Sequence, residues 1–342
     1  MFMFQQIFGI SLPIIQAPLA GIQGSPMALA VSEVGGLGSL PAAMLSMEDL
    51  QRELSILHAQ GRPFNINFFS HTPPTPDAER ETAWREALAP YYAELGLELE
   101  ALPAGPARTP FSSEAAELLR AFPPAVVSFH FGLPAPDLLA QVRATGAKIL
   151  SSATTVAEAR WLEDQGVDAI IAQGLEAGGH RGTFLSNDLD SQLSTLALVP
   201  QVVDAVKLPV IATGGIADAR GVAAVLALGA VAAQVGTAYM LCTEAKTSPL
   251  HRAALSSSAA QTTAITNLFT GRPARGIVNR IMRELGPIHP HLPPFPMAAA
   301  TMAPLRIQAE ARGSSDFSPL WAGQNTSGCR EVSAAELTRS LV

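Results

Sequence analysis

Cysteine is almost absent from this chain of 342 residues, which contains Cys242 and Cys329 and no other. Two cysteines so far apart match neither a disulfide framework nor the spacing of a cysteine metal site. Both thiols are therefore expected to be unpaired, which is typical of a protein from a reducing compartment. The composition predicts a cytoplasmic location.

Charged residues are also scarce, at 15% of the chain, with 22 Lys and Arg against 29 Asp and Glu and a net charge of −7. An acidic chain of this kind lacks the basic surface that a nucleic acid requires, so no nucleic-acid partner is expected. Hydrophobic residues make up 48% of the chain. That proportion supports a large core and excludes a disordered protein.

No long apolar run has the character of a membrane segment. No Lys or Arg precedes Arg52, so the apolar N-terminus lacks the positive region of a signal peptide. Residues 221–243 carry no charge and could span a bilayer by length alone. Gly229, Gln234 and Gly236 interrupt this stretch, which is better read as a helix followed by a strand. No membrane partner is predicted.

Several catalytic motifs are missing as well. No glycine-rich loop carries a Walker lysine, no G-x-G-x-x-G opens a helix after the first strand, and no G-x-S-x-G is present. These absences argue against a P-loop nucleotide site, a Rossmann dinucleotide site and a hydrolase nucleophile. His130 and His180 follow different strands and have no carboxylate at ligand spacing, so no metal site is predicted.

What the chain does contain is a series of short apolar runs separated by helical patterns. Such runs predict parallel strands joined by helices, and eight of them predict a closed (β/α)₈ TIM barrel. An open doubly wound sheet is the alternative, and it would also place ligands at the carboxyl ends of the strands. The predicted strands span residues 14–17, 37–40, 64–69, 126–131, 148–153, 169–172, 209–213 and 231–235.

Two segments fall outside this repeat. Residues 71–112 open with three prolines and form an insertion that contains a predicted helix. The tail is rich in proline between Pro287 and Pro296 and shows no strand pattern. We predict a barrel domain over residues 1–255, which includes the insertion, and a capping region over 256–342 that returns over the barrel mouth.

The most informative stretch follows the sixth predicted strand, where Gln173 is succeeded by a loop containing Gly178, Gly179 and His180. Glycine permits a positive φ or a close approach of the backbone to a ligand. A histidine held on such a loop is a candidate acid or base. A surface histidine on a flexible loop is the alternative interpretation.

Two further glycine loops follow the last two strands. Gly214 and Gly215 precede a helix, and Gly236 and Thr237 end the eighth strand. In TIM barrels a phosphate is commonly bound between the loops after strands seven and eight, so the pattern predicts a phosphate-bearing cofactor. On the third strand, Asn65 and Asn67 share one face and could bind a ligand or be satisfied by the backbone.

Together these motifs resemble those of class I nitronate monooxygenases, also known as 2-nitropropane dioxygenases, which are FMN-dependent barrel enzymes. The resemblance covers nearly the whole chain. The matching segments are Ile-Ile-Gln-Ala-Pro (14–18), Gly-Gly-Leu-Gly-Ser (35–39), Phe-Asn-Ile-Asn (64–67), Ser-Phe-His-Phe-Gly (128–132), Ala-Gln-Gly-Leu-Glu-Ala-Gly-Gly-His-Arg-Gly (172–182), Gly-Gly-Ile (214–216), Gln-Val-Gly-Thr-Ala (234–238) and Trp-Ala-Gly-Gln (321–324).

The resemblance implies a catalytic base at His180 and a substrate pocket near His130, Phe295 and Trp321. It implies oxidation of a nitronate such as propionate 3-nitronate, or of a nitroalkane, by O₂ through a flavin semiquinone, with release of nitrite and a carbonyl compound. Small molecules would be the only partners of a monomer or homodimer. The implied FMN-binding residues are Ala17, Pro18, Asn67, Gln173, Gly178, Gly179, Gly214, Gly215, Gln234, Val235, Gly236 and Thr237.

One departure from the resembled family concerns the substrate pocket. Family members carry two tyrosines and a lysine in the segment that matches residues 295–305, whereas Phe295, Ala299 and Ala303 occupy the aligned positions here. This change predicts a more apolar pocket that holds an anion less well. It favours a larger or less charged substrate, or another flavin reaction.

Two other functions fit the same motifs. An FMN-dependent NAD(P)H:quinone reductase or enoyl-ACP reductase of the same superfamily would be reduced rapidly by NADH. A protein that binds flavin without catalysis would lose only binding when His180 is replaced.

Overall fold

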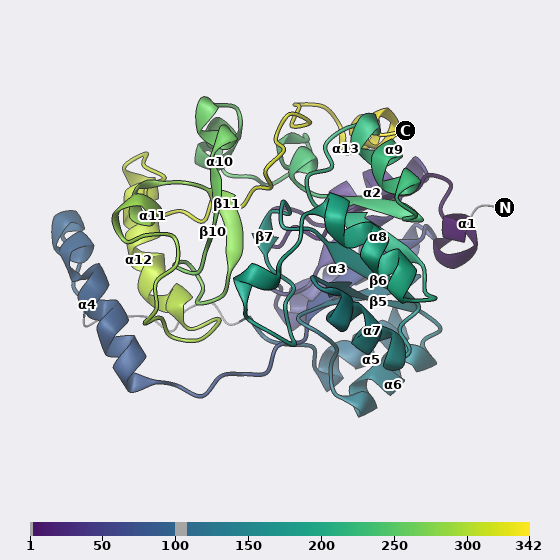
Figure 1. Cartoon of the computed structure of the whole chain (residues 1–342), viewed down its shortest axis with the longest axis horizontal. Helices are drawn as coiled ribbons and strands as arrows, with labels where there is room; N and C mark the ends of the chain where they lie inside the picture. The colour runs from purple at the N-terminus through teal and green to yellow at the C-terminus, as the bar shows by residue number, and fades with distance from the viewer. Residues whose placement is uncertain (1–2, 100–107) are drawn as a thin grey trace.

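The computed structural model describes residues 3–99 and 108–342, which form a barrel and a smaller lobe beside it (Figure 1). The barrel consists of eight parallel strands in the order β1-β9-β8-β6-β5-β4-β3-β2. A parallel bridge between Ile15 and Leu37 joins β1 to β2 and closes the sheet. The predicted (β/α)₈ barrel is thereby confirmed, and the open doubly wound sheet is excluded.

The observed strands agree with the predicted runs to within one or two residues. Each is short and buried along its whole length or nearly so, as expected for parallel strands covered by helices on the outside. The barrel strands are β1 (Ile14–Gln16), β2 (Gly38–Pro41), β3 (Phe64–Phe69), β4 (Val126–His130), β5 (Lys148–Ala153), β6 (Ala169–Gln173), β8 (Val210–Thr213) and β9 (Ala232–Val235).

The helices around the barrel begin at side-chain caps that the sequence supplies. Ser46 accepts a hydrogen bond from the Asp49 N–H at the start of α3, and Asp218 accepts one from Gly221 at the start of α9. The surrounding helices are α2 (Ser25–Glu33), α3 (Met47–Ala59), α5 (Ser113–Ala121), α6 (Pro136–Ala144), α7 (Val156–Asp164), α8 (Thr195–Ala205) and α9 (Ala219–Ala227).

One glycine of the 35–39 motif has a clear packing role. A Cβ at Gly38 would collide with the backbone carbonyl of Ala28, because α2 lies directly against β2. Glycine is therefore required at this position by the close approach of helix and strand rather than by its φ.

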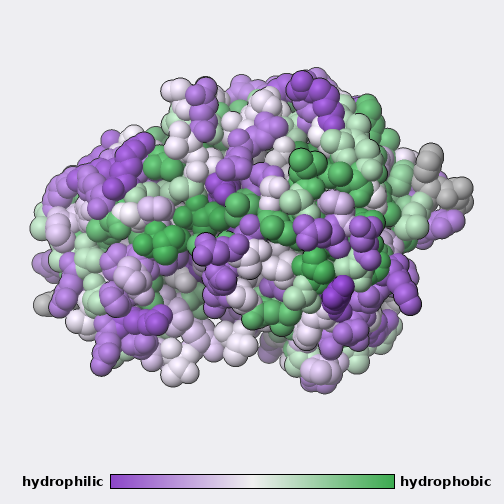
Figure 2. All heavy atoms as spheres, viewed as in Figure 1, coloured by the Kyte–Doolittle hydropathy of each residue, from purple (hydrophilic) through white to green (hydrophobic). Residues whose placement is uncertain are grey.

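A second lobe is built by the inserted segment together with the tail. Helix α4 (Ala78–Leu95), in the insertion, packs against α12 (Ala298–Ala311). Trp84, Tyr92 and Phe317 are fully buried in the core of this lobe. On the face shown in Figure 2, hydrophilic residues gather along the outer edge of this lobe.

The tail contains strands, which the sequence analysis did not predict. Strands β10 (Thr263–Thr266) and β11 (Ala274–Ile277) form an antiparallel sheet with β7 (Gly179–His180) from the glycine loop. The prediction of a strandless tail is therefore wrong. These strands of two to four residues depend on pairing with a distant segment, which leaves little periodic pattern in the sequence.

The chain also begins and ends against the barrel. Helix α1 (Met3–Phe8), which was not predicted, buries Phe4 and Phe8 beside the strands. Helix α13 (Ala334–Ser340) packs on α2. The predicted domain boundary at residue 255 stays a prediction. Helix α4, which belongs to the predicted barrel domain, lies in the second lobe, and α13, which belongs to the predicted capping region, lies on the barrel. The remaining elements are η1 (Leu189–Ser191), η2 (Thr237–Leu241), α10 (Pro249–Leu255), η3 (Ser258–Gln261) and α11 (Arg280–Glu284).

The uncharged stretch 221–243 folds as predicted, as most of α9, then β9 and η2. Within the described ranges 3–99 and 108–342, no helix combines the length and apolar character needed to cross a membrane.

Candidate active site

A cavity opens where the carboxyl ends of the barrel strands meet. Its wall includes Asn67 on β3, His130 on β4, Gln173 on β6 and Gln234 on β9. This is the face of a TIM barrel that carries the active site. The predicted site residues that line it are Ala17, Pro18, Asn67, His130, Gln173, Gly178, Gly179, His180, Gly214, Gly215, Gln234, Gly236, Thr237 and Trp321.

Two predicted site residues do not line the cavity. Val235 is buried in the barrel core, and its carbonyl accepts a hydrogen bond from the Ala17 N–H. Phe295 lies behind the wall and packs its ring against His180, with ring centroids 5.3 Å apart at an angle of 74°.

His180 lies on a strand rather than on a free loop. In β7 it pairs with Ala274 of β11, while Gly179 pairs with Arg275. Arg181, which is fully buried, fixes the same segment by donating to the carbonyls of Gln173 and Gly174. The alternative of a surface histidine on a flexible loop is therefore excluded.

The His180 ring is held in a defined orientation. Its Nε2 lies 3.0 Å from the hydroxyl of Thr270, and that hydroxyl can donate to the carbonyl of Arg272 at 3.4 Å. With the hydroxyl proton directed at this carbonyl, Thr270 accepts a hydrogen bond from Nε2–H. Nδ1 then carries the free lone pair of the ring.

Burial keeps His180 uncharged. Its pKa lies well below 6.5, mainly because burial disfavours the imidazolium, and next because Arg108 places a positive charge nearby. His71 and His130 share the same effect of burial, with pKa values lowered to about 4 and about 3. The cavity wall thus contains two neutral imidazoles, and His71 lies behind it against Phe295.

His130 supports His180 and uses both of its ring nitrogens to do so. Its Nε2 lies 3.1 Å from the carbonyl oxygen of His180, and its Nδ1 lies 3.0 Å from the Ser152 hydroxyl. A carbonyl only accepts, so Nε2 carries the proton and Nδ1 accepts from Ser152. His130 therefore positions the backbone of β7.

Gln173 has a similar positioning role. Its Nε2 donates to the carbonyl of His180, and its Oε1 accepts from the Gly182 N–H. The side-chain amide of Gln173, which was predicted to bind the cofactor, therefore also stabilises the segment that carries His180.

The two adjacent glycines of this segment serve different purposes. A Cβ at Gly178 would lie 2.5 Å from the backbone nitrogen of Gly323 and 2.6 Å from the carbonyl carbon of Ala322. Gly179 has a φ of +72°, and a Cβ there would meet nothing within 4 Å. Gly178 thus permits a close approach and Gly179 a left-handed turn, the two properties for which glycine was expected.

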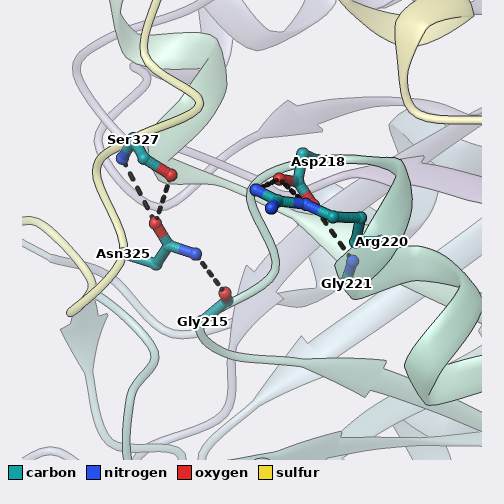
Figure 3. Close-up of polar contacts among 6 residues, drawn as sticks. All are labelled: Gly215, Asp218, Arg220, Gly221, Asn325 and Ser327. Atoms are coloured by element: carbon teal, nitrogen blue, oxygen red, sulfur yellow. Dashed lines mark hydrogen bonds and ion pairs between the residues drawn. The ribbon is translucent and has the colours of Figure 1, made fainter.

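The loops after β8 and β9 meet at the cavity, as the sequence predicted. Gly214 and Gly215 both have positive φ, at +120° and +71°. The tail closes over them, because the Asn325 side chain donates to the Gly215 carbonyl at 3.1 Å (Figure 3). Thr237 accepts a hydrogen bond from the Gly323 N–H at 3.0 Å.

The floor of the cavity contains an unsatisfied polar atom. The Oε1 of Gln234 is buried and has no hydrogen-bond partner among the described residues. Asn67, which also lines the cavity, donates to Ser128. A buried amide oxygen of this kind is free to accept a hydrogen bond from a ligand in the cavity. Asn65 lies deeper in the barrel and bonds to Ser39, so only Asn67 of the two asparagines reaches the cavity.

Three residues near His180 were missed by the sequence analysis. Phe69 lines the cavity and lies 6.2 Å from the His180 ring, and Thr270 bonds its Nε2. Arg108 lines the cavity from the end of the insertion. No local pattern marks Thr270 and Arg108, because each reaches the site from a distant segment of the chain, whereas Phe69 ends β3. The doublet Phe68–Phe69, directly after Asn67, is the one signal that could have indicated Phe69.

No cluster of metal-binding side chains is found within residues 3–99 and 108–342. Cys242 and Cys329 are both free thiols, and burial raises the pKa of each to about 12. The chemistry of the cavity therefore depends on its amides, backbone groups, imidazoles and Arg108.

The fold and the site define an enzyme of the (β/α)₈ class, with a cavity lined by its β8 and β9 loops and by a neutral histidine. The family model described as nitronate monooxygenase matches residues 2–342. This chain belongs to the nitronate monooxygenase family. Membership makes it a flavin-dependent oxidoreductase that acts on small molecules.

Individual relatives agree with this assignment. A nitronate monooxygenase of Pseudomonas aeruginosa is 42% identical, covering 99% of this chain and 97% of its own. One of Paraburkholderia phytofirmans is 41% identical, over 98% of this chain and 92% of the relative. The structure of nitroalkane oxidase from Streptomyces ansochromogenes is 38% identical, with a TM-score of 0.89 over 99% of this chain and 96% of that one.

The fold is shared more widely. FabK from Thermotoga maritima superimposes with a TM-score of 0.72 over the whole of this chain and 94% of its own, at 24% identity. At that identity the comparison supports the fold alone.

Proposed function

We propose that this protein is an FMN-dependent nitronate monooxygenase that oxidises alkyl nitronates or nitroalkanes with O₂. The observation that supports it most directly is a neutral, oriented His180 in the wall of the same cavity that contains an unsatisfied Gln234 Oε1. We also propose that the protein is cytoplasmic and that it is a monomer or a homodimer.

The residues around the cavity fit FMN. The glycine loops after β8 and β9 would hold the phosphate with backbone N–H groups, aided by the Thr237 hydroxyl. Gln234 and Asn67 would offer amide groups to the flavin. When bound, FMN would supply the electron acceptor that the oxidation requires.

His180 would handle the proton. The neutral imidazole takes the α-proton of a nitroalkane at Nδ1, while Nε2–H remains bonded to Thr270. His130 and Gln173 hold the His180 carbonyl and so fix the ring relative to the cavity. Phe69, Phe295 and Trp321 pack around the ring and keep water away from it.

The pH dependence follows from the low pKa of His180. A base is active above its pKa, so lowering the pH through 6.5 should leave His180 unprotonated and functional. We expect kcat/KM for nitroethane to stay nearly constant between pH 7.5 and 6 and to fall only at lower pH. Steady-state oxygen uptake across pH 5 to 7.5 measures this profile. A fall centred at pH 6.5 or above would show that His180 is not the base, or that it titrates like an exposed histidine.

The direct test of the proposal is oxygen uptake by the purified flavoprotein with a nitronate and without NADH. The reductase alternatives instead require NADH as the source of electrons.

A further inference from the structure

We propose that Arg108 binds the planar anionic group of the substrate, a nitronate or a carboxylate, and so supplies the cation that segment 295–305 lacks. This inference rests on the proposed function, since it names the group that would hold the substrate at that same site.

Arg108 is unusual in its charge and in its hydrogen bonding. Of the described residues that line the cavity, it alone carries a formal charge. Its Nη1 is buried with no hydrogen-bond partner, and none of the ion pairs in residues 3–99 and 108–342 includes it. A buried guanidinium nitrogen without an acceptor is costly to the free protein. An anionic ligand would provide the missing acceptor.

Other buried arginines near the site donate hydrogen bonds to acceptors within the protein. Arg181 donates to three acceptors, and Arg275 donates to the carbonyl of Leu175 and to Thr263. Arg272 donates from Nη2 to the Thr183 carbonyl and lies over the Phe131 ring at 3.9 Å, although its buried Nε has no hydrogen-bond partner among the described residues. These side chains hold the framework in place, whereas the contact found for the Arg108 guanidinium within residues 3–99 and 108–342 is with a ring, its Cζ lying 5.7 Å from the Phe295 centroid.

Arg108 is also placed correctly relative to the base. The Phe295 ring packs against both the Arg108 guanidinium and the His180 imidazole. The positive charge of Arg108 is felt at His180, where it lowers the pKa. Because the three nearby imidazoles are neutral, Arg108 provides the attraction for an anion that His180 itself does not provide.

The shape of the guanidinium suits such an anion. Its parallel N–H groups match two oxygens on one atom, as found in both a nitronate and a carboxylate, and such paired bonds are stronger than neutral ones. Phe69 in the cavity wall and Phe295 behind it, with ring centroids 6.2 Å apart, would strengthen the attraction by excluding water.

The test compares Arg108→Gln and Arg108→Lys with the wild-type holoenzyme on propionate 3-nitronate and on ethyl nitronate. We expect Arg108→Gln to raise KM by tenfold to about a hundredfold with kcat changed less than about threefold. Arg108→Lys should recover part of the loss. If KM of Arg108→Gln rises with both substrates, the nitronate group is the ligand of Arg108. If KM rises with propionate 3-nitronate alone, the carboxylate is the ligand.

Two controls separate this role from a structural one. Arg306→Gln removes the same charge from a neighbouring arginine on α12 whose side chain is 45% exposed, and it should leave KM unchanged. Arg108→Gln should keep or raise the Tm of the unliganded protein, because it removes an unpaired buried charge. A fall in Tm of more than about 5 °C would show that Arg108 supports the fold instead.

The remaining outcomes are distinct. If the wild type turns over both nitronates and Arg108→Gln has an unchanged KM, this inference is overturned and the proposed function stands. An equal rise in KM in Arg306→Gln shows a general field effect and also overturns it. No turnover of either nitronate by the wild type rejects the proposed function, and the inference with it.

Discussion

Replacing His180 with asparagine should lower kcat/KM for nitroethane by about 10²- to 10⁴-fold, the usual contribution of a general base. Asparagine retains polarity and comparable size but offers no basic nitrogen to take the α-proton. Oxidation of ethyl nitronate, which has already lost that proton, should fall by less than about tenfold. Oxygen uptake with the two substrates, measured on protein with its flavin content verified, gives the comparison.

The exposed His58 on α3 provides the matched control. His58→Asn makes the same chemical change far from the cavity and should leave both activities unchanged. An equal loss on nitroethane and ethyl nitronate in His180→Asn would contradict the assignment of His180 as base and would indicate a role in binding.

Replacing Gly178 with alanine should weaken the binding of FMN by about 10- to 100-fold. The new methyl group would lie 2.5 Å from the Gly323 nitrogen, so it must separate the glycine segment from the tail. Overpacking of this kind costs about 1–3 kcal/mol, and here both sides of the contact are backbone. Gly323 and Asn325, which line the cavity, would move with the tail. Titration of the deflavinated protein with FMN, followed by flavin fluorescence, measures the effect.

Gly146→Ala is the control for the intrinsic cost of replacing a glycine. Gly146 ends α6 with a φ of +83°, and a Cβ there meets nothing within 4 Å. This variant should lose about 1 kcal/mol of stability and bind FMN normally. Normal FMN binding by Gly178→Ala would mean that the tail does not form part of the cofactor site.

The barrel could be predicted from the sequence because the signals that define its strands and helices lie within short segments of the chain. Short apolar runs bounded by glycine and proline define each strand, and caps such as Ser46 define the helices. The glycine loops at Gly214, Gly215 and Gly236 could be found for the same reason, since parallel strands bring their carboxyl ends together.

The parts that could not be predicted depend on contacts between distant segments. His180 was expected on a loop, yet β11, nearly a hundred residues further on, makes it part of a strand. Segment 295–305 lacks the family lysine, which predicted a more apolar pocket, but Arg108 lines the cavity from the end of the insertion. His130 was expected near the substrate, and only its hydrogen bonds to Ser152 and to the His180 carbonyl reveal a positioning role.

The most direct measurement is oxygen uptake by the purified yellow holoenzyme with propionate 3-nitronate, in the presence and absence of NADH, with nitrite assayed in parallel and the released flavin identified. The account predicts FMN as the flavin, rapid uptake with nitrite release, and no dependence on NADH. No uptake with the nitronate, together with prompt bleaching of the flavin by NADH, would contradict it and identify the protein as a reductase.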